Sequence, residues 1–217
     1  MRLKLLALAS ILATGSTSLF AAAIPYPNPG TTLPAVPELV TANSNTITAY
    51  FVSVSASDVD TLFLYDESTN TLVGPAFGNQ GTAQGTSFNF AVSAGDTYAF
   101  EIQNSSDNPT QTFSSDPALS SDKGQHAYVT PFAGGTLAKG DGTAGSFVFP
   151  AGTYVGFEDL DFPLNGGEPD YNDLTFVFTN VTPVVNQTGV TPEPSTFILL
   201  GTGLLAAAGA VRRKLGR

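Results

Sequence analysis

Acidic side chains crowd one short segment of this sequence, from Glu158 to Asp173. Six carboxylates occupy these sixteen positions, and no Lys or Arg stands among them. Carboxylates this close repel one another, so a folded chain must keep them in water or neutralise them. Oxygen ligands without His or Cys suit a hard cation, and Ca²⁺, which takes six to eight oxygens in flexible geometry, fits better than Mg²⁺. The segment therefore predicts a calcium site.

The spacing predicts which side chains meet. In extended backbone alternate side chains share a face, so Asp159 and Asp161 are expected together, as are Asp170 and Asn172. The Gly166-Gly167 pair permits a tight reversal that brings the two groups close. The expected metal ligands are Glu158, Asp159, Asp161, Asp170, Asn172 and Asp173. The EF-hand pattern is not met, and a solvated acidic turn without an ion is the alternative.

The residues for nucleophilic catalysis are missing. The chain has one histidine, His126, no Cys and no G-x-S-x-G motif, which argues against a Ser or Cys hydrolase. A glycosidase needs only two carboxylates, so Glu158 with Asp161 or Glu168 keeps that alternative open. We predict a protein that is not an enzyme and has no catalytic residue. We expect His126 to be a structural or surface residue rather than a ligand.

Two segments together resemble a bacterial family, domain of unknown function 4114. The matching residues are Phe157-Glu158-Asp159, Gly166-Gly167 and Asp170-Tyr171-Asn172-Asp173, preceded by a Ser/Asp/His segment at 113–127. The resemblance covers residues 110–180 and implies a β-rich extracellular module, compatible with metal binding, with no known reaction. Glu168-Pro169 departs from the family pattern and leaves the loop geometry open. Residues 41–105 are not assigned by resemblance.

The middle of the chain must position the acidic segment, and its pattern predicts strands. Stretches rich in β-branched and aromatic residues alternate with Gly, Pro, Asn and Asp, with no helical period. The expected strands are 46–54, 61–65, 71–73, 86–92, 97–102, 125–129, 145–149, 153–157 and 174–181. We expect 86–92 and 97–102 to form a hairpin. This pattern predicts an all-β fold, one β-sandwich or jelly-roll-like domain over 41–182 with a core of Phe and Tyr.

Composition excludes other classes of protein. With 22 Gly, 15 Pro, no Cys and 12% charged residues, the 217-residue chain is neither a helical bundle, a coiled coil nor a disulfide scaffold. Its segment 24–191 holds 17 acidic and two basic residues, a formal charge of −15. Such a surface repels phosphate backbones, so we expect no nucleic-acid partner. Exposed aromatic rings could stack on sugars, although the chain has no Trp.

The N-terminus has the order of a secretory signal peptide over residues 1–23. Arg2 and Lys4 precede an apolar run, and Ala21-Ala22-Ala23 offers the small residues that signal peptidase accepts. Five prolines then predict an extended leader over 24–40 rather than a packed element. We therefore expect signal peptidase as a partner and an exported chain.

The C-terminus combines a polar stem over 183–196 that contains Pro192-Glu193-Pro194, an apolar stretch over 197–211 and a basic tail over 212–217. This order resembles the PEP-CTERM sorting signal of exopolysaccharide-producing Gram-negative bacteria. Fifteen helical residues reach about 22 Å, short of a hydrocarbon core of about 30 Å. We expect a short transmembrane helix that spans only with snorkelling or local thinning of the bilayer. Positive-inside topology places the tail in the cytoplasm, and an ordinary tail anchor is the alternative.

The resemblance implies that an exosortase recognises the motif and cleaves nearby, after a transient anchoring in the inner membrane. We therefore predict an exosortase-sorted protein of the cell surface or extracellular matrix, acting as a calcium-binding structural or adhesive module. Its further partners would be extracellular polysaccharide or other matrix proteins. The alternative is a carbohydrate-binding module or a polysaccharide-active hydrolase that uses the acidic loop.

Overall fold

The computed structural model describes residues 31–138, 146–162 and 169–184. The strands are β1 (Val40–Ala42), β2 (Thr46–Val54), β3 (Asp60–Asp66), β4 (Thr71–Val73), β5 (Ser87–Ala91), β6 (Thr97–Asn104), β7 (Gln111–Ser114), β8 (Ala127–Phe132), β9 (Gly135–Ala138), β10 (Ser146–Phe149), β11 (Gly152–Phe157), β12 (Leu174–Thr179) and β13 (Val181–Pro183). No helix occurs in these ranges, and the predicted all-β class is confirmed. Within them, no helical segment is long and apolar enough to cross a membrane. The predicted signal peptide, transmembrane stretch and basic tail lie outside these ranges.

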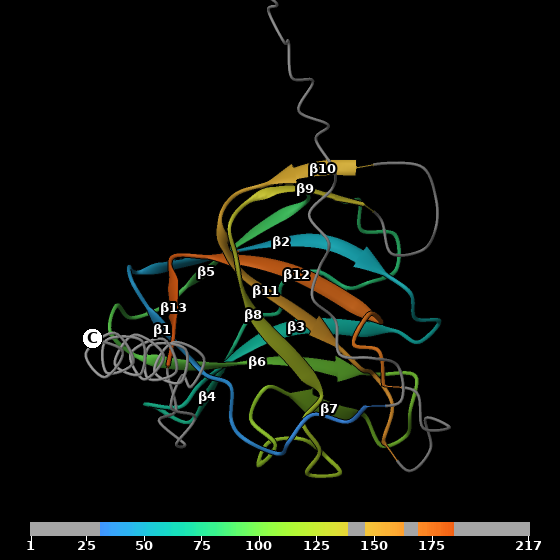
Figure 1. Ribbon diagram of the computed structural model, residues 1–217. Coiled ribbons are helices and arrows are strands. Elements are labelled where there is room, and N and C mark those ends of the chain that lie inside the picture. Colours follow the sequence, from blue (N-terminus) through green and yellow to red (C-terminus); the bar gives the residue numbers. More distant parts are fainter. Residues whose placement is uncertain (1–30, 139–145, 163–168, 185–217) are drawn as a thin grey trace, which may run out of the picture. The chain divides into compact units, whose positions relative to one another are not determined.

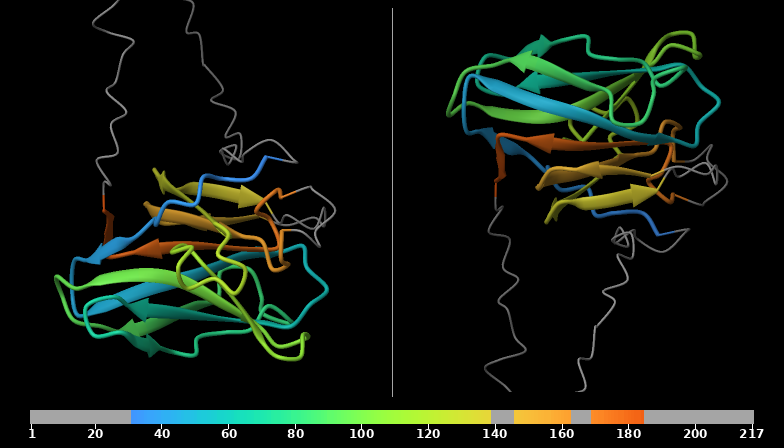
Figure 2. Two further views of the ribbon diagram at one scale, coloured as in Figure 1. Left: turned by 90° about the horizontal axis from the view of Figure 1, so that it is seen from below. Right: turned by 90° about the horizontal axis from the view of Figure 1, so that it is seen from above.

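The strands form two main antiparallel sheets. One sheet has the order β13-β1-β6-β3-β4, with β7 also paired to β6, and the other has the order β5-β2-β12-β11-β8. In Figure 1, β2 and β12 lie above β3 and β6, and Figure 2 shows the strands side by side within the layers. The strands β9 and β10 form a separate two-stranded sheet.

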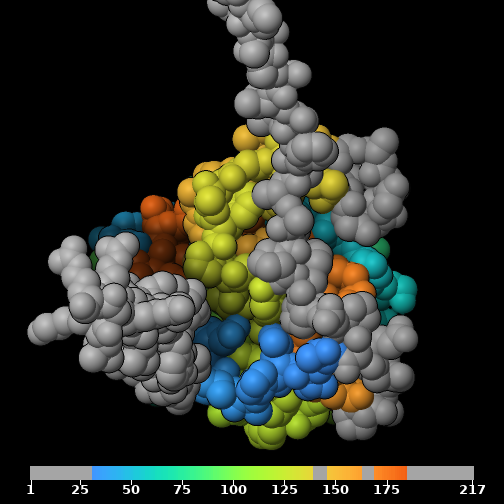
Figure 3. Space-filling view, in the orientation of Figure 1, coloured from blue at the N-terminus to red at the C-terminus, as the bar shows by residue number. Residues whose placement is uncertain are grey.

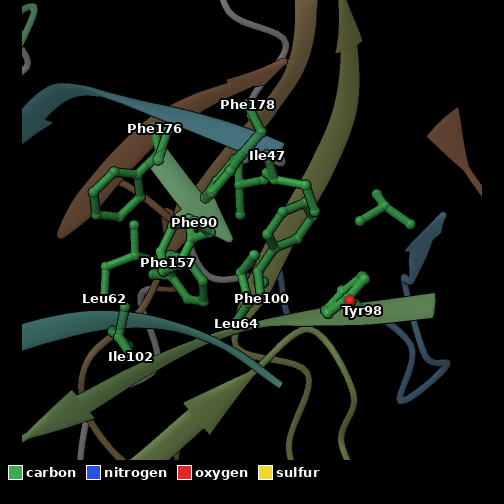
Figure 4. Packing of buried hydrophobic residues seen from close by; sticks show 14 of the residues in the cluster. Ile47, Leu62, Leu64, Phe90, Tyr98, Phe100, Ile102, Phe157, Phe176 and Phe178 are labelled. Carbon is green, nitrogen blue, oxygen red and sulfur yellow. The ribbon is translucent and has the colours of Figure 1, made fainter. Parts of the chain in front are cut away.

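Aromatic side chains from both sheets share one core. Burial alternates along β3, where Leu62 and Leu64 point inward, as expected of a strand with one face covered. Across the layers, the rings of Phe100 in β6 and Phe178 in β12 lie 4.3 Å apart between centroids. Figure 4 shows these rings packed with Phe157 and its neighbours. The predicted core of aromatic residues therefore fastens one sheet to the other.

The hairpin predicted from 86–92 and 97–102 is wrong. β5 pairs with β2, whereas β6 pairs with β1, β3 and β7, so the two strands belong to different sheets. The turn between them is tight, but its backbone bonds to Ala42 at the end of β1. Alternation of apolar and polar residues predicts a strand and its buried face, and it does not identify the sheet that the strand joins.

Residues 31–39 form no strand, but they are packed against the domain, contrary to the predicted free leader. Gln125 Nε2 donates to the carbonyl of Val36 at 2.8 Å, and Glu38 N donates to the carbonyl of Ser115 at 2.8 Å. The backbone N–H of Val129 donates to Glu38 Oε2 at 2.9 Å. In Figure 3 this blue segment lies against the yellow-green residues near 115–125.

The strand register brings three loops together at one end of the sandwich. Val54 at the end of β2 and Phe157 at the end of β11 both pair with Leu174 at the start of β12. In the other sheet, Asp60 at the start of β3 pairs with Asn104 at the end of β6. This is the right-hand end of β2 and β6 in Figure 1. The loops that follow β2, β6 and β11 therefore meet there.

Candidate metal centre

Glu158 anchors the acidic segment, and it is only 4% exposed. Its Oε1 accepts the backbone N–H of Asp170 at 2.6 Å and also that of Tyr171. Burial raises the pKa of Glu158 to about 8, helped by the negative charges of Asp173 and Asp170. The Tyr171 hydroxyl donates to the carbonyl of Gln125 at 3.1 Å. Glu158 therefore holds the returning end of the loop against the domain.

Asp159 and Asp173 meet two carboxylates from the other sheet. Asp159 N donates to Asp173 Oδ2 at 3.1 Å, and the side chain of Asp159 also interacts with that of Asp60. Burial raises the pKa of Asp60, Asp159 and Asp173 to about 7 in each case. The charge of Asp58 raises the pKa of Asp60 and Asp159 further. We call Asp58, Asp60, Asp159 and Asp173 the inter-sheet cluster.

Two buried amides fix the backbone around this cluster. Asn104 Nδ2 donates to Asp58 Oδ2 at 2.8 Å and to the carbonyl of Asp159 at 2.9 Å. Asn79 Nδ2 donates to Asp60 Oδ2 at 3.1 Å and to the carbonyl of Asp58 at 2.7 Å. The amides therefore join the segment before β3 to the segment after β11.

Two carboxylate oxygens of the cluster are buried without a hydrogen-bond partner. They are Asp60 Oδ1 and Asp159 Oδ2, on residues that are 0% and 3% exposed. A buried acceptor without a donor costs about 1–3 kcal/mol, and more when it carries charge. The side chains of Asp60 and Asp159 hydrogen-bond to each other, so either a proton shared by the two carboxyls or a cation would satisfy these oxygens.

The remaining predicted ligands lie outside the inter-sheet cluster. Asp161 does not share the surroundings of Asp159, because the chain bends at Leu160 rather than continuing as a strand. Its charged neighbours are Asp122, His126 and Asp107.

The expected pairing of Asp170 with Asn172 is present, since the Asp170 carboxylate accepts both the backbone and the side-chain N–H groups of Asn172. This pair closes a local turn.

His126 is a buried structural residue beside the loop. Its Nε2 lies 2.9 Å from Asp122 Oδ1, and its Nδ1 lies 3.2 Å from the carbonyl of Glu158. The ring stacks on Phe162 at 4.2 Å between centroids and also contacts Phe113. Burial lowers the pKa of His126, although Asp122 opposes this shift. Both ring nitrogens therefore face oxygens that fix the start of the acidic segment.

No basic side chain of the described ranges neutralises the cluster. Lys123 is the only Lys or Arg there, and its Nζ donates to the carbonyl of Ala118 at 2.8 Å. In the same ranges, no three His, Asp or Glu side chains already converge as a metal site. The arrangement is thus a cluster of two buried acids, Asp60 and Asp159, and two half-buried acids, Asp58 and Asp173, that attracts cations without enclosing one.

Sequence reasoning missed Asp58, Asp60 and Asn104. The first two form an Asp-Val-Asp pattern before a strand, which could have marked them as carboxylates on one face. Nothing local to the sequence indicates that this strand start faces the loop after β11. That proximity depends on the order of strands in two sheets.

The PEP-CTERM protein-sorting motif matches residues 190–214 of the chain. Comparison with curated proteins and comparison with solved structures each return no significant match. The motif implies a protein that is exported and processed at the membrane, with exosortase as its sorting partner. It lies outside the described residues, so the sorting signal and the acidic cluster are independent observations.

Proposed function

We propose that this protein is a calcium-binding structural or adhesive module, carried to the cell surface or the extracellular matrix by exosortase sorting. The sorting motif supports the route of export. The observation that carries calcium binding is the pair of buried carboxylate oxygens without partners in the inter-sheet cluster. The resemblance of residues 110–180 to domain of unknown function 4114 belongs to the same proposal, as an extracellular β-rich module.

Calcium would resolve an electrostatic conflict in this domain. Without a cation, the raised pKa values of Asp60, Asp159 and Asp173 mean that the folded chain retains protons near neutral pH. A divalent ion with oxygen preference supplies the missing positive charge and binds the oxygens that have no donor. Calcium binding would then release protons, because the ligands must be ionised. The folded state would gain stability from the ion.

A polysaccharide hydrolase that uses Glu158 is less well supported. The acid in such an enzyme must reach a glycosidic oxygen in a cleft. Glu158 is buried, and one of its oxygens already binds two backbone N–H groups. A glycan array combined with a reducing-end release assay tests this alternative. Binding without release would indicate a carbohydrate-binding module, and release that is lost in Glu158→Gln would indicate an enzyme.

The calcium proposal is tested by thermal unfolding of the purified exported chain in chelator and in calcium. Binding to the folded state alone adds about 2.7 kcal/mol when calcium is a hundredfold above its Kd, which corresponds to several degrees in Tm. Asp173→Asn should reduce the shift. Asp96→Asn is the matched control, because Asp96 precedes β6 at the opposite end from Asn104. Equal shifts in both variants would indicate general screening, and no shift in the wild type would exclude the proposal.

A further inference from the structure

Asp60 and Asp159 face each other across the two sheets. Asp60 is the first residue of β3, in one sheet, and Asp159 follows the end of β11, in the other. Their carboxyl groups hydrogen-bond to each other, which requires a proton on one of them, and both residues are almost wholly buried. Apart from such a shared proton, no donor of the described residues reaches Oδ1 of Asp60 or Oδ2 of Asp159. The two sheets therefore present unpaired carboxylate oxygens to one place.

The surrounding hydrogen bonds leave these oxygens unpaired. Asn79 binds Asp60 through Oδ2 only, which leaves Oδ1 unbound. Asn104 binds the backbone carbonyl of Asp159 and not its carboxylate. The side-chain amides of Asn79 and Asn104 therefore position the segment before β3 and the segment after β11, and neither donates to the two unpaired oxygens. Ionisation of both carboxyls would place two negative charges in contact, so the pair favours a positive charge between them, either a shared proton or a cation.

We propose that Asp60 and Asp159 bind one calcium ion between them, so that the ion joins β3 of one sheet to the loop after β11 of the other. The inference rests on the proposed calcium function and assigns its site. The carboxylates of Asp58 and Asp173 both act electrostatically on the pair, and Asp173 also accepts the backbone N–H of Asp159. Since no three such side chains converge among the residues that the structure describes, rotation of Asp58 or Asp173, or water, must complete the coordination.

This site differs from one formed by the loop alone. In the loop, the Asp170 carboxylate is occupied by Asn172, and Glu158 by backbone N–H groups. An inter-sheet site requires Asp60, which lies about a hundred positions earlier in the chain than the loop. The two arrangements therefore predict opposite responses to substitution of Asp60 and Asp170.

The experiment compares Asp60→Asn with Asp170→Asn in calcium titrations of the exported chain, followed by calorimetry and by Tm. Asp60→Asn keeps an oxygen for the N–H of Asn79 and removes one buried charge. It should weaken calcium binding by about tenfold or more, because affinity follows the charge count of the ligands. In chelator at pH 8 its Tm should equal or exceed that of the wild type. Asp170→Asn should bind calcium within about threefold of the wild type, because the Asp170 carboxylate already binds Asn172 and is no ligand of an inter-sheet ion.

Hydrogen exchange with and without calcium gives a second measurement. If Asp60 served the fold alone, calcium would not change amide exchange at the two segments that Asp60 and Asp159 join. Calcium should slow amide exchange in β3 and at the start of β12 together in the wild type, and in neither segment in Asp60→Asn. Wild-type binding that is retained in Asp60→Asn and lost in Asp170→Asn would overturn the inter-sheet site and leave the calcium function standing at the loop. No calcium binding by the wild type would overturn both.

Discussion

The backbone N–H of Asp159 donates to the carboxylate of Asp173 at 3.1 Å, so the two ends of the acidic segment are fastened to each other. These ends directly follow β11 and precede β12, which pair with each other from Thr153–Phe178 to Phe157–Leu174. The paired strands therefore fix the positions of both ends. Asp173 is thereby held beside the opposite sheet, where it meets Asp60. The described parts of the acidic segment, 158–162 and 169–173, therefore belong to this end of the sandwich.

Asn104, in β6, connects the start of the acidic segment to the opposite sheet, and its replacement should lower the stability of the domain. Asn104→Ala deletes the hydrogen bonds to Asp58 and to the carbonyl of Asp159, and it leaves a buried carbonyl without a donor. We expect a loss of about 2–3 kcal/mol in the free energy of unfolding, measured in urea. Asn89→Ala is the control, because its bond to Thr48 is exposed and the change should stay within about 0.5 kcal/mol. Equal losses in both variants would contradict this role.

Gly156 allows β11 to approach the loop closely. A Cβ at this position would lie 2.2 Å from the carbonyl oxygen of Tyr171, so Gly156→Ala must displace backbone. We expect destabilisation of more than about 2 kcal/mol and a weakened calcium response, since Tyr171 is held by Glu158. At Gly78, by contrast, the nearest atom to an added Cβ is 3.2 Å away, so Gly78→Ala should cost less. Thermal unfolding with and without calcium compares them, and a milder effect at Gly156 would refute the packing argument.

The sequence predicted strands well and their partners poorly. The run 46–54 coincides with β2, because seven of its nine residues are β-branched or aromatic, which outweighs any local alternative. The strands β1, β7, β9 and β13 were missed, because three or four residues show little alternation of their own, although β4, equally short, was predicted at 71–73. The same limit applies to the site. The acidic segment is visible in the sequence, but Asp60 joins it only through a topology that places β3 opposite β11.

His126 should support the fold without binding the ion. His126→Phe keeps contact with Phe113 and Phe162 but removes the ring nitrogens that face Asp122 and the carbonyl of Glu158. We expect a loss of about 2 kcal/mol in stability, because two hydrogen bonds of a buried side chain are lost. The calcium affinity at a temperature where the variant is folded should change less than threefold. Loss of calcium binding by a folded His126→Phe would contradict this assignment.

Glu38 should give the domain a pH dependence that is separate from the acidic cluster. Burial raises its pKa to about 7 from the ordinary 4.5, although its bond from Val129 opposes the shift. The folded chain therefore holds this proton more tightly than the unfolded chain, and stability falls as pH rises from about 4.5 to about 7. Glu38→Gln keeps an acceptor for Val129 and should flatten part of this fall, measured by urea unfolding in chelator at pH 5 and 7.5. An unchanged difference between the two pH values would exclude Glu38 as a contributor.

The sorting motif predicts how the chain is processed. Proline disfavours helix in the residue that precedes it, so from the sequence we expect a protease to reach Pro192-Glu193-Pro194 before the apolar stretch. We expect mass spectrometry of the exported protein to show a chain that starts near Ile24 and ends near Pro194. Glu193→Ala should retain the basic tail and remain in the membrane fraction, whereas Thr188→Ala in the same stem should be processed normally. Recovery of the intact wild type, with Arg217, from the soluble fraction of the cell would contradict exosortase sorting.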